Sequence, residues 1–203
     1  MLDFATVRYR ASTLWLATGY SRWMNSSVSA NTSRKHYVAI LIGLQIAIFL
    51  SALDQTVLNV AIPKMAQALH GFDKSAWIIT AYLLFSTIAT PLSGKLADIY
   101  GAKSVLLVAT FLFGLASVFC GSAGLIDPLF GFDAIDQLIL ARAFQGIAGG
   151  AMIGLCFISI GDLFPVAERG KYQGFLAAAF IVAALIGPAL GGWLTDKNSW
   201  RII

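Results

Sequence analysis

The sequence predicts an all-α integral membrane protein with five complete transmembrane helices and the start of a sixth. Of its 203 residues, 58% are hydrophobic and only 12% are charged. A soluble domain has about 45–50% apolar and about 25% charged residues, so the charged side chains here cannot cover a soluble surface. This excludes a cytosolic enzyme, a disordered chain and a nucleic-acid binder built on a basic patch. The strands of a membrane β-barrel are segments of about ten residues in which apolar and polar residues alternate, and the sequence shows no such segments.

Charged residues mark the ends of five apolar runs, which we place at residues 37–62, 76–97, 104–124, 137–160 and 173–195. The second, third and fifth runs are free of charge over 20, 23 and 24 residues. Each run reaches the roughly 20 residues that a spanning helix needs. Five such runs in succession favour membrane spans over the buried helices of a soluble core.

The Lys and Arg residues of the short loops predict the orientation of the spans. With a cytoplasmic N-terminus, nine of these residues lie inside and four outside, and Arg142 lies within the membrane. We therefore expect a multi-pass protein of the inner (plasma) membrane. Residues 1–36 form the predicted cytoplasmic tail, and residues 37–203 form an incomplete N-terminal six-helix transport domain.

The first 23 residues contain no clean apolar run and do not form a signal peptide. Met24 opens a more ordinary polar tail, so a mis-assigned start and a genuine amphipathic leader both stay open. The two cysteines, Cys120 and Cys156, lie in apolar runs, which argues against a disulfide framework.

Two charged residues are predicted inside the membrane, where a charge costs about 2.5–3.5 kcal/mol and is usually functional. Asp54 lies in the first span next to Gln55 and Asn59, which share one helix face. A buried carboxylate favours its neutral form, as a proton carrier requires; the alternative is a carboxylate permanently paired with Arg142. Arg142 stays charged and cannot carry the proton. We expect it to tune Asp54, the alternative being that it snorkels to the outer interface.

Small residues recur at helical spacing in the last two spans. Gly146, Gly150 and Gly154 follow this spacing in the fourth span, and Ala183, Gly187 and Gly191 follow it in the fifth. Such faces predict close helix packing. Pro188 predicts a bend in the fifth helix because proline removes one backbone hydrogen bond.

Two connections between the spans each carry three charged residues. The segment 94–103 is a predicted cytoplasmic loop in which Gly101 permits a tight turn and Asp98 and Lys103 face the cytoplasm. The outer loop from residue 125 to residue 137 is acidic, and we interpret it as solvated. We identify no catalytic residue and no metal-binding spacing, so an enzyme is not expected.

Four motifs occur in order along the chain: 53–63 (LDQTVLNVAIP), 94–103 (GKLADIYGAK), 138–146 (LILARAFQG) and 187–192 (GPALGG). Together they resemble the N-terminal part of a major facilitator superfamily transporter, in the branch of fourteen-span drug:proton antiporters. The resemblance covers about residues 34–203, including Trp200-Arg201 at the start of a sixth span. It implies a partial major-facilitator helical bundle.

The resemblance implies proton-coupled multidrug efflux by two halves that rock around a central site. The proton gradient is the energy source and no cofactor is implied. Asp54 and Arg142 would couple the protons, and Gln55, Asn59 and Gln145 would line the substrate cavity. The implied partners are the lipid bilayer and small lipophilic, cationic substrates, with no nucleic acid. The C-terminal half that transport requires is missing, because fourteen spans need roughly 450 residues.

The loop motif implied by the family consists of Gly94, Asp98, Gly101 and Lys103, and the antiporter motif of Gly187, Pro188, Gly191 and Gly192. The chain departs from the family pattern at Ile99 and Ala102, where basic residues are usual, and at Ala183, where glycine is usual. Asp98 is then left with Lys103 or Arg169 as its expected partner. Two alternatives stay open: a transporter of another small solute on the same fold, and a truncated remnant that does not transport.

Overall fold

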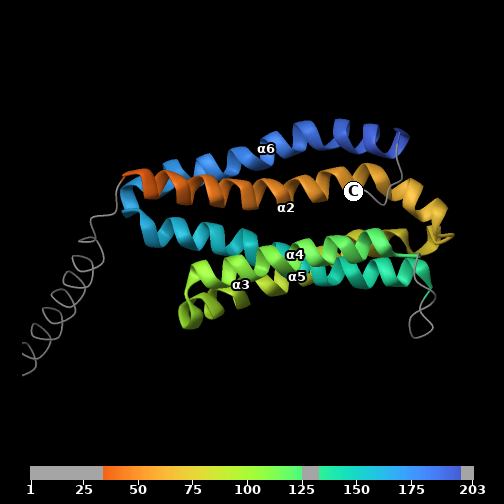
Figure 1. Ribbon diagram of the computed structural model, residues 1–203, viewed down its shortest axis with the longest axis horizontal. Coiled ribbons are helices and arrows are strands. Elements are labelled where there is room, and N and C mark those ends of the chain that lie inside the picture. The colour runs from red at the N-terminus through yellow and green to blue at the C-terminus, as the bar shows by residue number, and fades with distance from the viewer. Residues whose placement is uncertain (1–33, 125–132, 198–203) are drawn as a thin grey trace, which may run out of the picture. The chain divides into compact units, whose positions relative to one another are not determined.

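The computed structural model describes residues 34–124 and 133–197, and within them every regular element is a helix (Figure 1). The elements are α2 (Arg34–Ala68), the short 3-10 helix η1 (Phe72–Lys74), α3 (Ser75–Tyr100), α4 (Ala102–Ser122), α5 (Ala134–Leu163) and α6 (Val166–Lys197). Five of them are long and apolar enough to cross a membrane. The predicted all-α membrane fold with five spans is therefore confirmed.

Contacts divide the chain into two compact units, residues 1–41 and residues 42–203. Of the first unit, the structure describes only the beginning of α2. Every contact discussed below lies within the second unit. The predictions for residues 1–23, for Asp127 and for Trp200-Arg201 fall outside the described residues.

The predicted ends of two helices were wrong. The first span does not end before Pro63, because α2 continues through this proline to Ala68. A membrane helix tolerates proline where neighbouring groups satisfy the freed carbonyl. The expected loop at 94–103 is mostly helical, since α3 runs to Tyr100 and α4 begins at Ala102. Gly101 alone separates them, with a φ of 84° that glycine adopts without strain.

The small-residue face of α5 packs directly on the backbone of α3. A Cβ added to Gly146 would lie 2.9 Å from the Cα of Tyr82, and one added to Gly150 would lie 2.6 Å from the Cα of Ser86. At Gly154 the added atom would lie 3.2 Å from the carbonyl oxygen of Thr90. These distances confirm the predicted close packing and identify α3 as the helix that it admits.

The small-residue face of α6 packs in the same way on α2, which lies beside it in Figure 1. A Cβ at Gly191 would lie 2.8 Å from the carbonyl oxygen of Val57, and one at Gly187 would overlap the side chain of Thr56. The Thr56 hydroxyl donates a hydrogen bond to the carbonyl oxygen of Ala183 at 3.1 Å. The two helices are thus joined by close backbone packing and by a hydrogen bond between them.

Charged pairs join helices near one end of the bundle. Lys64 of α2 pairs with Asp196 of α6 and donates to the carbonyl oxygen of Thr195 at 2.9 Å. Lys74 pairs with Asp136 of α5 at 2.8 Å. The interpretation of Asp136 as part of a solvated loop was wrong, because this residue lies in the first turn of α5 and is partly buried.

Candidate functional site

The centre of the candidate site is an ion pair between α2 and α5. The Nη1 atom of Arg142 lies 2.7 Å from the Oδ2 atom of Asp54. The arginine side chain is 2% exposed and the aspartate side chain 11% exposed. The alternative that Arg142 snorkels to the interface was therefore wrong, because its charge is satisfied inside the bundle. The alternative of a permanent pair between Asp54 and Arg142 requires this contact, and the contact is present. Proton exchange at Asp54 stays a prediction.

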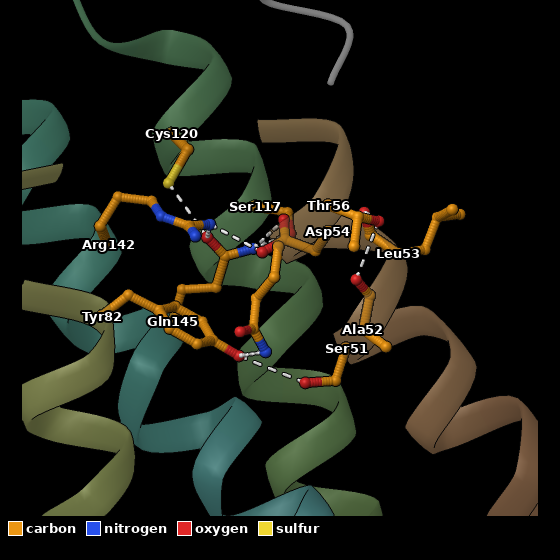
Figure 2. A network of polar contacts seen from close by, with 11 residues as sticks. Ser51, Ala52, Leu53, Asp54, Thr56, Tyr82, Ser117, Cys120, Arg142 and Gln145 are labelled. Atoms are coloured by element: carbon orange, nitrogen blue, oxygen red, sulfur yellow. Dashed lines mark hydrogen bonds and ion pairs between the residues drawn. The ribbon is translucent and has the colours of Figure 1, made fainter. Parts of the chain in front are cut away.

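Gln145 links this ion pair to α4 (Figure 2). Its side-chain Nε2 donates to Asp54 Oδ1 at 2.9 Å and to the hydroxyl of Ser117 at 2.8 Å. Its Oε1 accepts hydrogen bonds from Arg142 Nη1 and from the thiol of Cys120. Arg142 and Gln145 stand three residues apart, so one face of α5 presents both side chains to the carboxylate.

Tyr82 of α3 lies beneath the same arginine. The guanidinium carbon of Arg142 is 4.6 Å from the centre of the Tyr82 ring. The tyrosine hydroxyl lies 3.2 Å from the hydroxyl of Ser51 and accepts a hydrogen bond from Gln55 Nε2 at 3.4 Å. Four helices therefore contribute side chains to one buried polar network.

A small cavity adjoins the ion pair. Its polar lining consists of Asp54, Ser117, Cys120, Arg142 and Gln145, and its apolar lining includes Leu58, Met65 and Leu138. The cavity volume is about 10 Å³, which is roughly the space that one water molecule needs. The Nε atom of Arg142 is buried and has no hydrogen-bond partner among the described residues.

The structure brings some of the predicted site residues together and separates others. Asp54, Arg142, Gln145 and Gln55 belong to the network. Asn59 is exposed, and none of the network contacts described above involves it. The expectation that Gln55 and Asn59 act as one face of a cavity therefore has no support in these contacts.

The two further motifs contribute no side chain to the contacts of the network described above. Asp98 and Lys103 are exposed on either side of Gly101. Gly94 lies within α3, where an added Cβ would lie 3.3 Å from the side chain of Ile158. Among the ion pairs of the described residues, none joins Asp98 to Lys103 or Arg169, so the expected partner is not observed. The antiporter motif lies in α6 with Pro188 inside the helix, and a Cβ at Gly192 would meet open space.

Sequence reasoning missed Ser51, Tyr82, Ser117 and Cys120. A hydroxyl in a membrane helix commonly bonds a carbonyl of its own helix, as Thr80 and Thr87 do here. Of these four residues, Tyr82 was the one that the sequence could have indicated, because it is a polar aromatic residue within an apolar run. Both cysteines are free, in keeping with the sequence prediction. No group of His, Cys, Asp and Glu side chains within the described ranges is arranged to hold a metal ion.

The chain is similar in sequence to known membrane transporters. Residues 44–203 match the sequence profile of the Major Facilitator Superfamily. The chain is 41% identical over 162 residues to the multidrug transporter protein MdtP of Bacillus subtilis, covering 80% of this chain and 28% of the relative. It is 42% identical over 161 residues to the efflux pump dotC of Dothistroma septosporum, covering 79% of this chain and 26% of the pump.

A third relative is named for a different role. The vacuolar membrane amino acid uptake transporter fnx2 of Schizosaccharomyces pombe is 34% identical over 177 residues, covering 87% of this chain and 28% of the relative. The chain thus spans between a quarter and a third of the length of these relatives.

Proposed function

The chain belongs to the Major Facilitator Superfamily, and from this premise we propose that its activity is the proton-coupled efflux of small lipophilic cations. The name of the efflux pump dotC supports efflux as the direction of transport, and the name of the multidrug transporter MdtP supports a broad range of substrates. Transporters built from two related halves move substrates by rocking the halves around a site near the bilayer midplane. In this proposal the proton gradient drives the rocking, and no cofactor takes part.

One observation carries the proposal: a carboxylate sits inside a membrane-spanning helix and is almost fully enclosed by partners from other helices. Arginine stays charged at every accessible pH, so of the two paired groups only Asp54 can exchange a proton. Protonation of Asp54 would remove its charge and weaken its bond to Arg142. Because this bond joins α2 to α5, proton binding would loosen one helix from the other, which is how we connect proton uptake to movement.

We further propose that the protein lies in the plasma membrane with its N-terminus in the cytoplasm. The support is the distribution of Lys and Arg in the short loops, with nine on the proposed inner side and four on the outer side. Protons would then reach Asp54 from outside and leave toward the cytoplasm.

The test is ethidium efflux driven by an imposed proton gradient, measured for the complete transporter that contains this chain and for its Asp54→Asn variant. Asparagine keeps hydrogen-bonding groups for Arg142 and Gln145 but cannot take up a proton. We expect gradient-driven efflux to fall to the background of membranes without the protein, with an unchanged amount of protein inserted.

The matched control is Asp73→Asn, the same substitution at an exposed carboxylate of η1. This variant should pump like the wild type. Ethidium efflux at the wild-type rate by Asp54→Asn would contradict the assignment of Asp54 as the proton carrier.

A second candidate is the transport of another small solute, which the name of the relative fnx2 favours. Gradient-driven amino acid transport in the same vesicles, without ethidium efflux, would favour this candidate. The Asp54→Asn variant should abolish that transport as well, because the coupling carboxylate is the same in both.

A further inference from the structure

Tyr82 joins α2, α3 and α5 at the candidate site. It lies in the first half of α3 and is 2% exposed. Its hydroxyl contacts Ser51 and Gln55, which stand one turn apart on α2 on either side of Asp54 in the sequence. The tyrosine thus holds the segment of α2 that carries the coupling carboxylate.

The face of the tyrosine ring has a separate partner. Figure 2 shows the ring of Tyr82 below the guanidinium of Arg142, and the distance of 4.6 Å lies within the roughly 6 Å range of a cation–π contact. The same guanidinium donates to Asp54 at 2.7 Å. Arg142 therefore has two partners for its charge, a carboxylate and an aromatic face.

Two glycines of α5 make room for this tyrosine. A Cβ at Gly149 would overlap the Tyr82 hydroxyl and lie 3.1 Å from the ring carbon that carries it. A Cβ at Gly146 would lie 2.9 Å from the Tyr82 Cα. The ring can reach Arg142 only because both positions lack a side chain, so the backbone of α5 is shaped around this contact.

We propose that Tyr82 is a positioning residue that holds Arg142 while Asp54 is protonated, and that it thereby raises the proton affinity of Asp54. The proposal rests on the proposed function of Asp54 as proton carrier. A neutral Asp54 leaves the guanidinium buried without a counter-ion, which is a costly state. The ring is a second partner that stays in contact with the guanidinium, and its attraction is strongest for a desolvated cation. Because this partner remains when the carboxylate releases the guanidinium, the ring lowers the cost of the protonated state.

Three helices bring titratable groups close to Asp54. Arg142 faces it from α5, Tyr82 from α3, and Cys120 reaches the network from α4 through Gln145. Helix α6 packs on α2 through small residues and brings no titratable side chain into the network among the described residues. A change confined to the ring of Tyr82 therefore leaves every other charge in place.

The test is an infrared pH titration of the purified full chain in detergent. The carbonyl band of a protonated carboxyl group reports Asp54 directly, and Asp54→Asn identifies the band by removing it. Tyr82→Phe and its ring-fluorinated analogues then keep the shape of the ring while fluorine withdraws the negative charge from its face.

We expect the proton affinity of Asp54 to fall stepwise with fluorination, to roughly one tenth for the most fluorinated ring. This is a shift of the titration midpoint by about one pH unit to lower pH, or about 1.4 kcal/mol. Tyr82→Phe itself should retain most of the affinity, because it loses the hydroxyl contacts but keeps the aromatic face. Tyr82→Leu, which removes the face, should shift the midpoint as far as the most fluorinated ring.

The outcomes separate the two proposals. A midpoint that stays constant along the fluorinated series, in protein with unchanged unfolding temperature, overturns the role of Tyr82 while Asp54 still titrates. A carboxyl band that does not titrate in the wild type, across the pH range in which the chain is folded, overturns the proposed proton carrier and this inference with it. Because fluorination preserves the ring shape, the series gives an answer even if Tyr82→Leu fails to fold.

Discussion

Replacing Gly150 with alanine should destabilise the bundle, whereas the same replacement at Gly114 should not. At Gly150 the new Cβ would lie 2.6 Å from the Cα of Ser86 and 2.8 Å from its carbonyl carbon. Carbon atoms that are not bonded prefer separations of about 3.5–4.0 Å, so α3 and α5 would have to move apart by roughly 1 Å. At Gly114 no atom lies within 4 Å of the new Cβ.

The size of the effect follows from two opposing contributions. Overpacking costs about 1–3 kcal/mol. Alanine is about 1 kcal/mol more favourable than glycine inside a helix, and this gain applies to both variants. The unfolding free energies of the two variants should therefore differ by about 1–3 kcal/mol. At about 2–4 °C per kcal/mol for a chain of this size, the unfolding temperatures should differ by roughly 2–12 °C.

The assay is thermal unfolding of the purified chain in detergent, followed by circular dichroism for the wild type and the two variants. Gly114→Ala should unfold at or slightly above the wild-type temperature, and Gly150→Ala should unfold below it. Equal unfolding temperatures for the two variants would refute the reasoning, because only the contact with the α3 backbone distinguishes them.

Two further predictions concern the contacts of α2 and α5. Gly187→Ala should lower the unfolding temperature by forcing a Cβ to within 2.6 Å of the Cβ of Thr56, and the loss should be smaller in a Thr56→Gly background; additive losses in this double-mutant cycle would contradict the contact. Lys74→Met should lower the unfolding temperature only slightly, because the pair with Asp136 is partly exposed to solvent. Since salt screens such a pair, the difference from the wild type should shrink at about 1 M salt, and a difference that does not shrink would argue against a charge effect.

The sequence allowed the fold class and the number of described spans to be predicted, because apolar runs of sufficient length have few alternatives to crossing a membrane. The helix ends were harder to predict. Pro63 suggested a stop, but α2 continues past it. The charged segment 94–103 suggested a loop, but a single glycine at position 101 suffices for the turn. Charge and proline indicate where a helix can end in solvent, whereas tertiary contacts decide where it ends.

The candidate site could be predicted in part for a similar reason. Asp54 and Arg142 stand out because a charge inside an apolar run is costly and rare. Ser117 does not stand out, since spans contain many hydroxyl groups and most of those described here bond their own helix. Which hydroxyl crosses to another helix depends on how the helices face one another, and this is set by packing rather than by any local pattern.

The position of Arg142 on α5 follows from this packing. In the most apolar window of α5, 61% of the residues are buried, against 17–28% in the other four spans, so α5 is the central helix of the described bundle. A buried guanidinium needs partners from several directions, and α5 contacts three elements that supply them: α2 with Asp54, α3 with Tyr82 and α4 through Gln145. Its small-residue face begins at Gly146, one turn after Arg142, and brings α3 close enough for the aromatic contact. On a helix that faces lipid over most of its surface, the same arginine would lack these partners and would have to reach the interface instead.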